Sequence, residues 1–197
     1  MLKFLFCFLF RLFTPTTDFE AINKMGLTTY KEERVWISDL ESQFLLFIFI
    51  DPNCPITQKY IPKINALMNK YDLLVYGVQP NQGTYYDEVM KFKDDYGFKF
   101  PVINDSIQKL TYYLNASVTP EVFLLDKSGT LIYSGAIDNW FFDLGRYRKS
   151  ATVHYLRDAL DSNYGSLFSI NNPIGVPVVL PSKTPDRILS LIHISEP

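Results

Sequence analysis

Residues 44–71 read FLLFIFIDPNCPITQKYIPKINALMNKY, and the fold of the chain depends on this stretch. Its first seven residues are all apolar, and a run of this length is typical of a strand buried on both faces. From Ile56 to Met68, apolar side chains recur at the spacing of one face of a helix. Cys54 lies between the two, just before Pro55, and proline is favoured in the first turn of a helix. The pattern predicts a buried strand at residues 44–50 that delivers Cys54 to the start of a helix at residues 55–71.

The composition indicates an ordinary globular protein. The chain has 197 residues, of which 47% are hydrophobic and 20% charged, enough for one domain with its own core. A net charge of −2 and a pI near 5.7 argue against a nucleic-acid partner, because no basic stripe is available to neutralise phosphates. The two cysteines and two histidines are too few for a disulfide framework or a Cys/His metal site. We therefore expect no metal and no other cofactor.

The first 14 residues form a possible signal or anchor segment. Residues 1–13, MLKFLFCFLFRLF, place one lysine before a run of leucine and phenylalanine, as in a secretory signal. The run is too short to span a bilayer as a helix, so we expect membrane contact only through this segment. Export, for example to a periplasm, is the favoured interpretation. The alternatives are an interfacial anchor or a misassigned start, and the protein is cytoplasmic if the segment is not a signal.

Two further segments follow the predicted domain, which we place at residues 33–166 after a lead-in at residues 15–32. Residues 167–188 carry four prolines and are predicted to run as an extended tail over the surface. Residues 189–197, LSLIHISEP, match the translation of a transposase adapter used in sequencing libraries. We therefore interpret them as read-through rather than native sequence.

Apolar runs and turn residues predict the rest of the domain as strands and helices. Buried strands are expected at residues 73–78 and 122–125, the second paired as a hairpin with residues 130–134. Because a βαβ unit closes right-handed, helices should cover both faces of the sheet in an α/β sandwich. The other elements expected are an edge strand at residues 33–37, a helix capped by Thr84 and ending near residue 96, a short edge strand at 100–103, a helix from 104 to about 114, a long loop at 135–149 and a last helix at 153–164.

Four segments of this domain resemble the thioredoxin superfamily, and more narrowly the redoxin (alkyl hydroperoxide reductase/thiol-specific antioxidant) proteins of exported bacterial type. They are DPNCP at residues 51–55, FPV at 100–102, TPEVFLLD at 119–126 and GAIDNW at 135–140. The resemblance implies a thioredoxin-like three-layer sandwich, with a central mixed sheet and helices on both faces. It also implies that Pro120 is cis and faces the cysteine across the active site.

Three departures from the family's pattern bear on the chemistry. Thioredoxin-type enzymes carry a second cysteine three residues after the first, where this chain has Thr57. Peroxidatic redoxins carry Pro-x-x-x-Thr/Ser-x-x-Cys, whereas this chain has Phe47 and Asp51 at the first two conserved positions. Close relatives often end in Gly-Cys after a proline-rich tail, and here the adapter-like residues take that place. The sequence therefore predicts a one-cysteine site whose resolving thiol comes from elsewhere.

Cys54 is the predicted reactive residue. The thiolate attacks disulfides and peroxides, and the free N–H groups at a helix N-terminus favour a thiolate. Thr57 can hydrogen-bond the sulfur, whereas Asp51 and Glu121 would disfavour the thiolate if they lay close. A lone cysteine beside a core strand can instead be a buried small hydrophobe, but its place after a polar turn predicts exposure. The predicted catalytic residues are Cys54, Thr57 and Pro120, with Pro55, Asn53, Thr119, Glu121 and Trp140 as supporting or substrate-binding residues.

Three functions remain open from the sequence. The first is a thiol-dependent oxidoreductase whose partner is a thiol/disulfide protein or a small-molecule thiol. The second is a redoxin-type thiol peroxidase, in which Cys54 is oxidised to a sulfenic acid. The third is a non-catalytic thioredoxin-like binding module. The sequence also leaves the roles of two residues open. Pro120 could be an ordinary turn proline, and Trp140 could either line a substrate groove or pack under the long loop.

Overall fold

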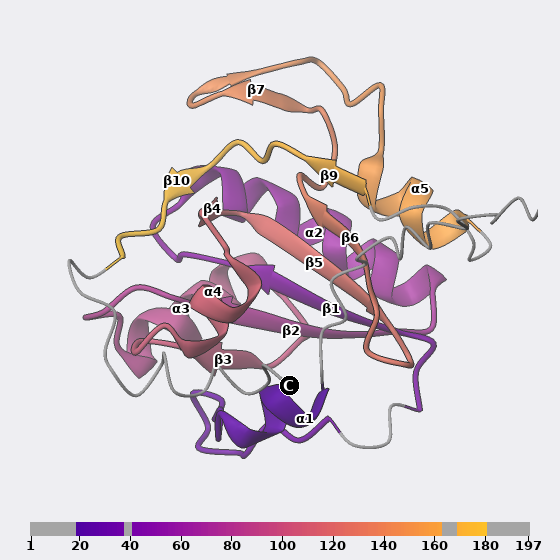
Figure 1. The fold of residues 1–197 in the computed structure, drawn as a ribbon. Helices are drawn as coiled ribbons and strands as arrows, with labels where there is room; N and C mark the ends of the chain where they lie inside the picture. Colours follow the sequence, from indigo (N-terminus) through magenta and orange to yellow (C-terminus); the bar gives the residue numbers. More distant parts are fainter. Residues whose placement is uncertain (1–18, 38–40, 163–168, 181–197) are drawn as a thin grey trace, which may run out of the picture.

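The computed structural model describes residues 19–37, 41–162 and 169–180, which are built around a mixed six-stranded sheet (Figure 1). The strands follow the order β3-β2-β1-β5-β6-β9. Pairing is parallel among β1, β2 and β3, antiparallel from β1 through β5 to β6, and parallel between β6 and β9. The bounds are β1 Phe44–Phe49, β2 Leu73–Gln79, β3 Val102–Asn104, β5 Glu121–Asp126, β6 Leu131–Gly135 and β9 Ser169–Asn171.

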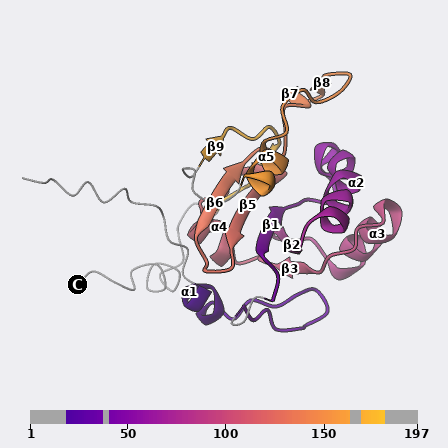
Figure 2. The same ribbon diagram turned by 90° about the vertical axis from the view of Figure 1, so that its right-hand side faces the viewer.

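Helices cover both faces of the sheet, so the predicted α/β sandwich is confirmed (Figure 2). One face of β1, with Leu46 and Ile48, shares an apolar cluster with α2, α3 and α5. The other face, with Leu45 and Phe47, shares a second cluster with α1 and α4. Successive side chains of β1 enter opposite clusters, which is why all six of its residues are buried. The helices are α1 Phe19–Lys24, α2 Pro55–Lys70, α3 Tyr86–Tyr96, α4 Lys109–Leu114 and α5 Tyr155–Asp161.

The predicted edge strand at residues 33–37 is wrong. The Val35 N–H donates to the Leu27 carbonyl at 2.9 Å, so this segment folds back on the lead-in instead of joining the sheet. At the outer edge of β3, Thr29 makes an isolated antiparallel bridge with Ile103. The lead-in also contains α1, which sequence analysis missed because six residues are too few to show a helical period.

Two helices begin later than predicted. The N-cap of α3 is Tyr85 rather than Thr84, because the Thr84 hydroxyl accepts a hydrogen bond from Gln79 Nε2 at 2.8 Å. The helix expected from residue 104 begins only at Lys109, since Gln108 has a left-handed backbone with φ of 58°. Side-chain contacts and local backbone turns therefore override the capping pattern at both places.

The predicted loop at residues 135–149 contains a small hairpin that stands away from the sheet (Figure 1). Its strands are β7 (Phe141–Asp143) and β8 (Arg146–Tyr147), and they pair antiparallel. The exposed side chains of the hairpin include Phe142, Leu144 and Tyr147.

The proline-rich segment is extended over its described part, residues 169–180, but it is also part of the fold. β9 joins the central sheet, and β10 (Val176–Pro177) pairs antiparallel with β4 (Val118–Thr119). The predictions for residues 1–14 and 189–197 fall outside the described residues. Within the described ranges, no helix has the length and apolarity that crossing a membrane requires.

Candidate functional site

Cys54 is the N-cap residue of α2 and ends the turn that follows β1. Its N–H donates to the Asp51 carbonyl at 3.0 Å, and its sulfur accepts a hydrogen bond from the Thr57 N–H at 3.4 Å. Pro55 opens the helix, where its missing N–H is harmless because first-turn N–H groups have no partner within the helix. The Cys54 sulfur therefore lies at the N-terminus of α2.

The segment that faces Cys54 is Thr119–Pro120, which connects the end of β4 to the start of β5. The Thr119–Pro120 peptide bond is cis, and the Thr119 carbonyl accepts a hydrogen bond from the Cys54 thiol at 3.1 Å. Antiparallel pairing produces this contact, because it sets Phe49, at the end of β1, opposite Glu121, at the beginning of β5. The structure thus brings Cys54, Thr119 and Pro120 together.

The prediction that Cys54 is exposed is wrong. The residue is 0% exposed and belongs to the apolar cluster beneath α2. Its neighbours Asn53 and Pro55 are exposed, so the turn itself faces solvent as the sequence indicated. An N-cap side chain turns inward to meet the first helical N–H groups, and here that turn directs the sulfur under the Thr119 carbonyl.

Thr57 is also fully buried, but its hydroxyl does not bind the sulfur as predicted. The contact to the Cys54 sulfur is made by the Thr57 backbone N–H. No described residue offers a hydrogen bond to Thr57 Oγ1, which is itself buried. The contribution of Thr57 to the site is therefore its N–H and the space that its side chain fills.

The two acids near the site have partners of their own. Glu121 accepts hydrogen bonds from the Ser117 N–H at 2.7 Å, the Ser117 hydroxyl at 3.1 Å and the Val118 N–H at 3.3 Å. Burial raises the pKa of Glu121, and these hydrogen bonds oppose the rise. Asp51 accepts from the Asn53 N–H at 2.7 Å. Glu121 therefore holds the loop that leads into β4, and Asp51 holds the turn before Cys54.

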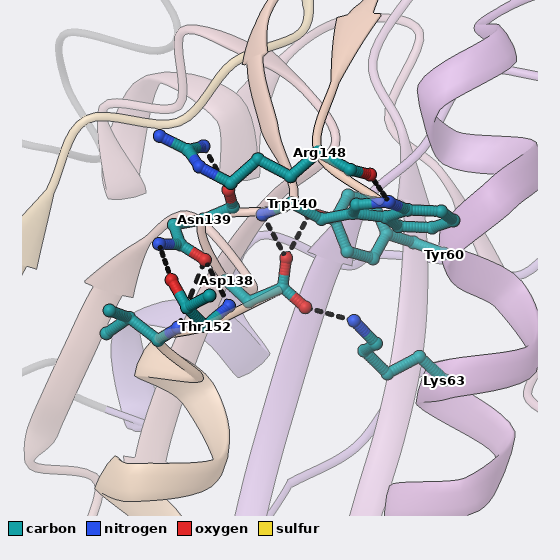
Figure 3. Close-up of polar contacts among 8 residues, drawn as sticks. Tyr60, Lys63, Asp138, Asn139, Trp140, Arg148 and Thr152 are labelled. Atoms are coloured by element: carbon teal, nitrogen blue, oxygen red, sulfur yellow. Dashed lines mark hydrogen bonds and ion pairs between the residues drawn. The ribbon is translucent and has the colours of Figure 1, made fainter. Parts of the chain in front are cut away.

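Asp138 forms a buried polar cluster beside the site, which the sequence did not reveal (Figure 3). Its carboxylate accepts hydrogen bonds from the Tyr60 hydroxyl at 2.6 Å and the Trp140 N–H at 2.8 Å, and it forms an ion pair with Lys63. Burial, and then the hydrogen bond to Asp138, raise the pKa of Tyr60, so its hydroxyl remains a donor. The available signal was the spacing of Tyr60 and Lys63, which puts both on one face of α2.

Trp140 belongs to this cluster. Its indole N–H donates to the Arg148 carbonyl at 2.8 Å, and its ring meets the Tyr60 ring edge to face with centroids 5.7 Å apart (Figure 3). The ring therefore packs at the base of the β7–β8 hairpin.

A small crevice connects the Asp138 cluster to the cis peptide bond. Its volume of about 10 Å³ is close to the smallest that can hold one water molecule. It is lined by Tyr60, Pro120, Ala136, Ile137, Asp138, Phe141 and Ile174. In the described part of the chain, no group of three or more His, Cys, Asp or Glu side chains is placed to hold a metal ion.

A family model and several solved structures match the chain. The model of the AhpC/TSA family matches residues 15–134. No curated protein matches significantly. A hypothetical protein from Sinorhizobium meliloti is similar in structure with a TM-score of 0.63 and 22% identity, over 80% of this chain and 91% of that one.

Two further structures extend the comparison. An uncharacterised conserved protein from Geobacillus kaustophilus has a TM-score of 0.62 and 18% identity, over 80% of this chain and 89% of that one. A thioredoxin-like protein from Aeropyrum pernix has a TM-score of 0.50 and 18% identity, over 59% of this chain and 84% of that one. The fold is thioredoxin-like, as the sequence resemblance implied.

Proposed function

The chain belongs to the AhpC/TSA family, and from that premise we propose that it is a thiol-dependent oxidoreductase that exchanges disulfides through Cys54. One observation carries the proposal: the Cys54 sulfur lies at the N-terminus of α2, between the Thr57 N–H and the carbonyl that precedes cis Pro120. A helix N-terminus favours the sulfur anion that such chemistry requires.

The proposed reaction begins with a nucleophilic attack by the Cys54 thiolate on one sulfur of a substrate disulfide. That S–S bond breaks, the departing sulfur takes up a proton from water, and Cys54 is left in a mixed disulfide with the substrate. A small-molecule or protein thiolate then attacks the Cys54 sulfur and releases the substrate as a second thiol. A further such thiolate frees Cys54, so the substrate disulfide is reduced while two thiols are oxidised to a disulfide.

The resolving thiol in this scheme comes from another molecule or from a part of the chain outside the described residues. Cys54 is the free cysteine of the described part, and Thr57 occupies the position of a second cysteine in a dithiol motif. We therefore propose Pro120 and Thr119 as the residues that orient the substrate, and Thr57 as a residue that supports the sulfur through its N–H.

The test is the glutathione-dependent reduction of a fluorescent peptide disulfide by wild type, Cys54→Ser and Cys7→Ser. We expect turnover by wild type and by Cys7→Ser, and background rates for Cys54→Ser. Turnover that survives Cys54→Ser would overturn the proposal. If none of the three proteins turns over the peptide disulfide but all of them bind the peptide, the result would favour a binding module.

A thiol peroxidase is the competing assignment within the same family, and two features count against it. Phe47 stands where peroxidatic relatives have proline, and it is fully buried in the cluster on the far face of the sheet. The Asp51 carboxylate stands where they have Thr or Ser, and it is engaged by Asn53. In stopped-flow mixing with hydrogen peroxide, we expect oxidation no faster than that of free cysteine. A faster reaction would favour the peroxidase.

We also propose that this chemistry takes place after export, because residues 1–13 have the composition of a secretory signal. The test is fractionation of cells that produce the full chain. Recovery of the protein in the cytoplasm, with residues 1–13 intact, would argue for the cytoplasmic alternative.

A further inference from the structure

Residues 172–178, which we call the C-terminal strap, run beside β4 (Figure 1), and the Thr119 carbonyl of β4 is the one that the Cys54 thiol contacts. Val176 pairs with Thr119 in an antiparallel ladder, and Pro177 pairs with Val118. The Val178 N–H adds a hydrogen bond of 2.9 Å to the Ser117 carbonyl. The strap thus occupies the edge of the strand that ends at the cis peptide bond.

The strap and the Cys54 sulfur contact the same carbonyl group. A Cβ atom added at Gly175 would lie 2.1 Å from the Thr119 oxygen, so only glycine permits this approach. That oxygen also accepts the hydrogen bond from the Cys54 thiol at 3.1 Å. The position of the strap backbone is therefore tied directly to the surroundings of the sulfur.

Apolar contacts also hold the strap against the site. Ile174 and Val176 are partly buried and pack against the cluster that contains Cys54. Ile174 also lines the crevice beside Pro120 and Asp138. With these contacts in place, Cys54 is 0% exposed.

The strap is held more weakly than the strands of the central sheet. Its ladder with β4 contains two residue pairs, whereas β1 and β5 form six. Pro173 and Pro177 have no N–H group, so neither can donate a hydrogen bond to a neighbouring strand. Segments with few backbone hydrogen bonds open locally at a lower free energy than the whole domain unfolds.

We propose that the strap is an internal competitor of an extended substrate polypeptide: it occupies the edge of β4 beside Cys54 and covers the sulfur until it leaves. The inference rests on the proposed function, because the polypeptide is the one whose disulfide Cys54 attacks. A segment that replaced the strap would pair with Val118 and Thr119, and this pairing would hold its own sulfur close to Cys54. Access to Cys54 then requires the strap to leave.

The first test uses Gly175→Val in the full chain, because a valine side chain does not fit against the Thr119 carbonyl. Alkylation of Cys54 by iodoacetamide at one fixed pH should be at least about tenfold faster than in wild type, since a covered thiol reacts only through the open population. Peptide mapping by mass spectrometry separates Cys54 from Cys7. The matched control is Val179→Ser, at a side chain that is 77% exposed, and it should react at the wild-type rate.

A second variant, Ile174→Ser, removes an apolar contact of the strap without creating a clash. It should raise the alkylation rate in the same direction, by less than Gly175→Val, and it keeps the test decisive if the valine variant does not fold. Amide hydrogen exchange at Val178 reports independently whether the strap has left β4.

Competition in trans tests the docking surface itself. The peptide NPIGVPVVL, which copies residues 172–180, should slow Cys54 alkylation in Gly175→Val by re-covering the site. The same peptide with the Gly175→Val change should have no effect.

The outcomes separate the two proposals. If the Val178 amide exchanges fast in the variants while Cys54 alkylation stays at the wild-type rate, the strap does not control access and the inference is wrong. If alkylation accelerates but no variant reduces a peptide disulfide, the strap does cover Cys54 and it is the proposed function that fails.

Discussion

The thiol of Cys54 donates a hydrogen bond to the carbonyl of Thr119, 65 residues further along the chain, at a distance of 3.1 Å. The same sulfur accepts a hydrogen bond from the Thr57 N–H. When the thiol gives up its proton, the bond to Thr119 is lost and the bond to Thr57 remains. The contact with Thr119 therefore belongs to the protonated form of the site, and of these two hydrogen bonds only the one from the Thr57 N–H is available to the thiolate.

Thr57→Val should stabilise the protein by about 1 kcal/mol, because valine has nearly the same shape and removes a buried hydroxyl with no hydrogen-bond partner among the described residues. The Thr57 N–H is untouched, so the alkylation rate of Cys54 should not change. Urea unfolding measures the stability and iodoacetamide measures the reactivity. A loss of stability would mean that the hydroxyl has a partner, such as a bound water.

Thr57→Cys should convert the site into a self-resolving dithiol. In an N-capped helix the N-cap and N3 side chains reach toward each other, and residues 54 and 57 occupy these positions. We expect the mixed disulfide at Cys54 to be released at least about tenfold faster than in wild type, because the second thiolate is intramolecular. Quenched mixed-disulfide assays measure this rate. Lys59→Cys, on an exposed position of the same helix, should leave the rate unchanged.

The stability of the protein should depend on pH through Glu121. Burial raises the pKa of Glu121 above its usual value of 4.5, so the folded protein binds this proton more tightly than the unfolded chain. Its contribution to stability is therefore complete below pH 4.5 and is lost as the pH rises through the raised pKa. Relative to Glu121→Gln, wild type should lose unfolding free energy as the pH rises above 4.5. A difference that grows with pH would contradict the assignment.

Removal of the Asp138 carboxylate should destabilise the protein by about 2–4 kcal/mol in Asp138→Ala, because it leaves the Tyr60 hydroxyl and the Lys63 ammonium without their acceptor. Lys63→Met should cost less, since its side chain is 32% exposed while that of Asp138 is 1% exposed. A double-mutant cycle, measured by urea unfolding, gives the interaction energy between Asp138 and Lys63. Asp95→Asn serves as the control, because the Lys91–Asp95 pair is exposed and its loss should not be measurable.

The strand–turn–helix unit around Cys54 could be predicted from the sequence because its determinants are local. Seven apolar residues, a turn, and an apolar face at helical spacing lie within 28 consecutive residues, 44–71. The observed β1 and α2 match these expectations to within one residue at each end. The hairpin of β5 and β6 was predictable for the same reason, since a tight turn with Gly129 connects its two strands.

The burial of Cys54 could not be predicted, because it depends on contacts between distant residues. The sequence around the cysteine is polar and faces solvent, while the sulfur contacts Thr119, which the strap contacts in turn. The Asp138 cluster was missed for a similar reason: Tyr60 and Lys63 lie 78 and 75 residues from their shared acceptor. Capping patterns and helical periodicity depend on neighbouring residues, so they cannot predict contacts between residues this far apart in the sequence.

The position of the strap along the chain means that it is synthesised after the other elements of the Cys54 site. Residues 172–178 leave the ribosome after α2, β4 and β5, so the elements that carry Cys54 and Thr119 are synthesised before the strap. If the strap covers Cys54 as we propose, a newly made chain passes through a period in which the cysteine can react with a nearby disulfide. Closure by the strap ends that period, and a chain that acquires a mixed disulfide first would be held in the open form.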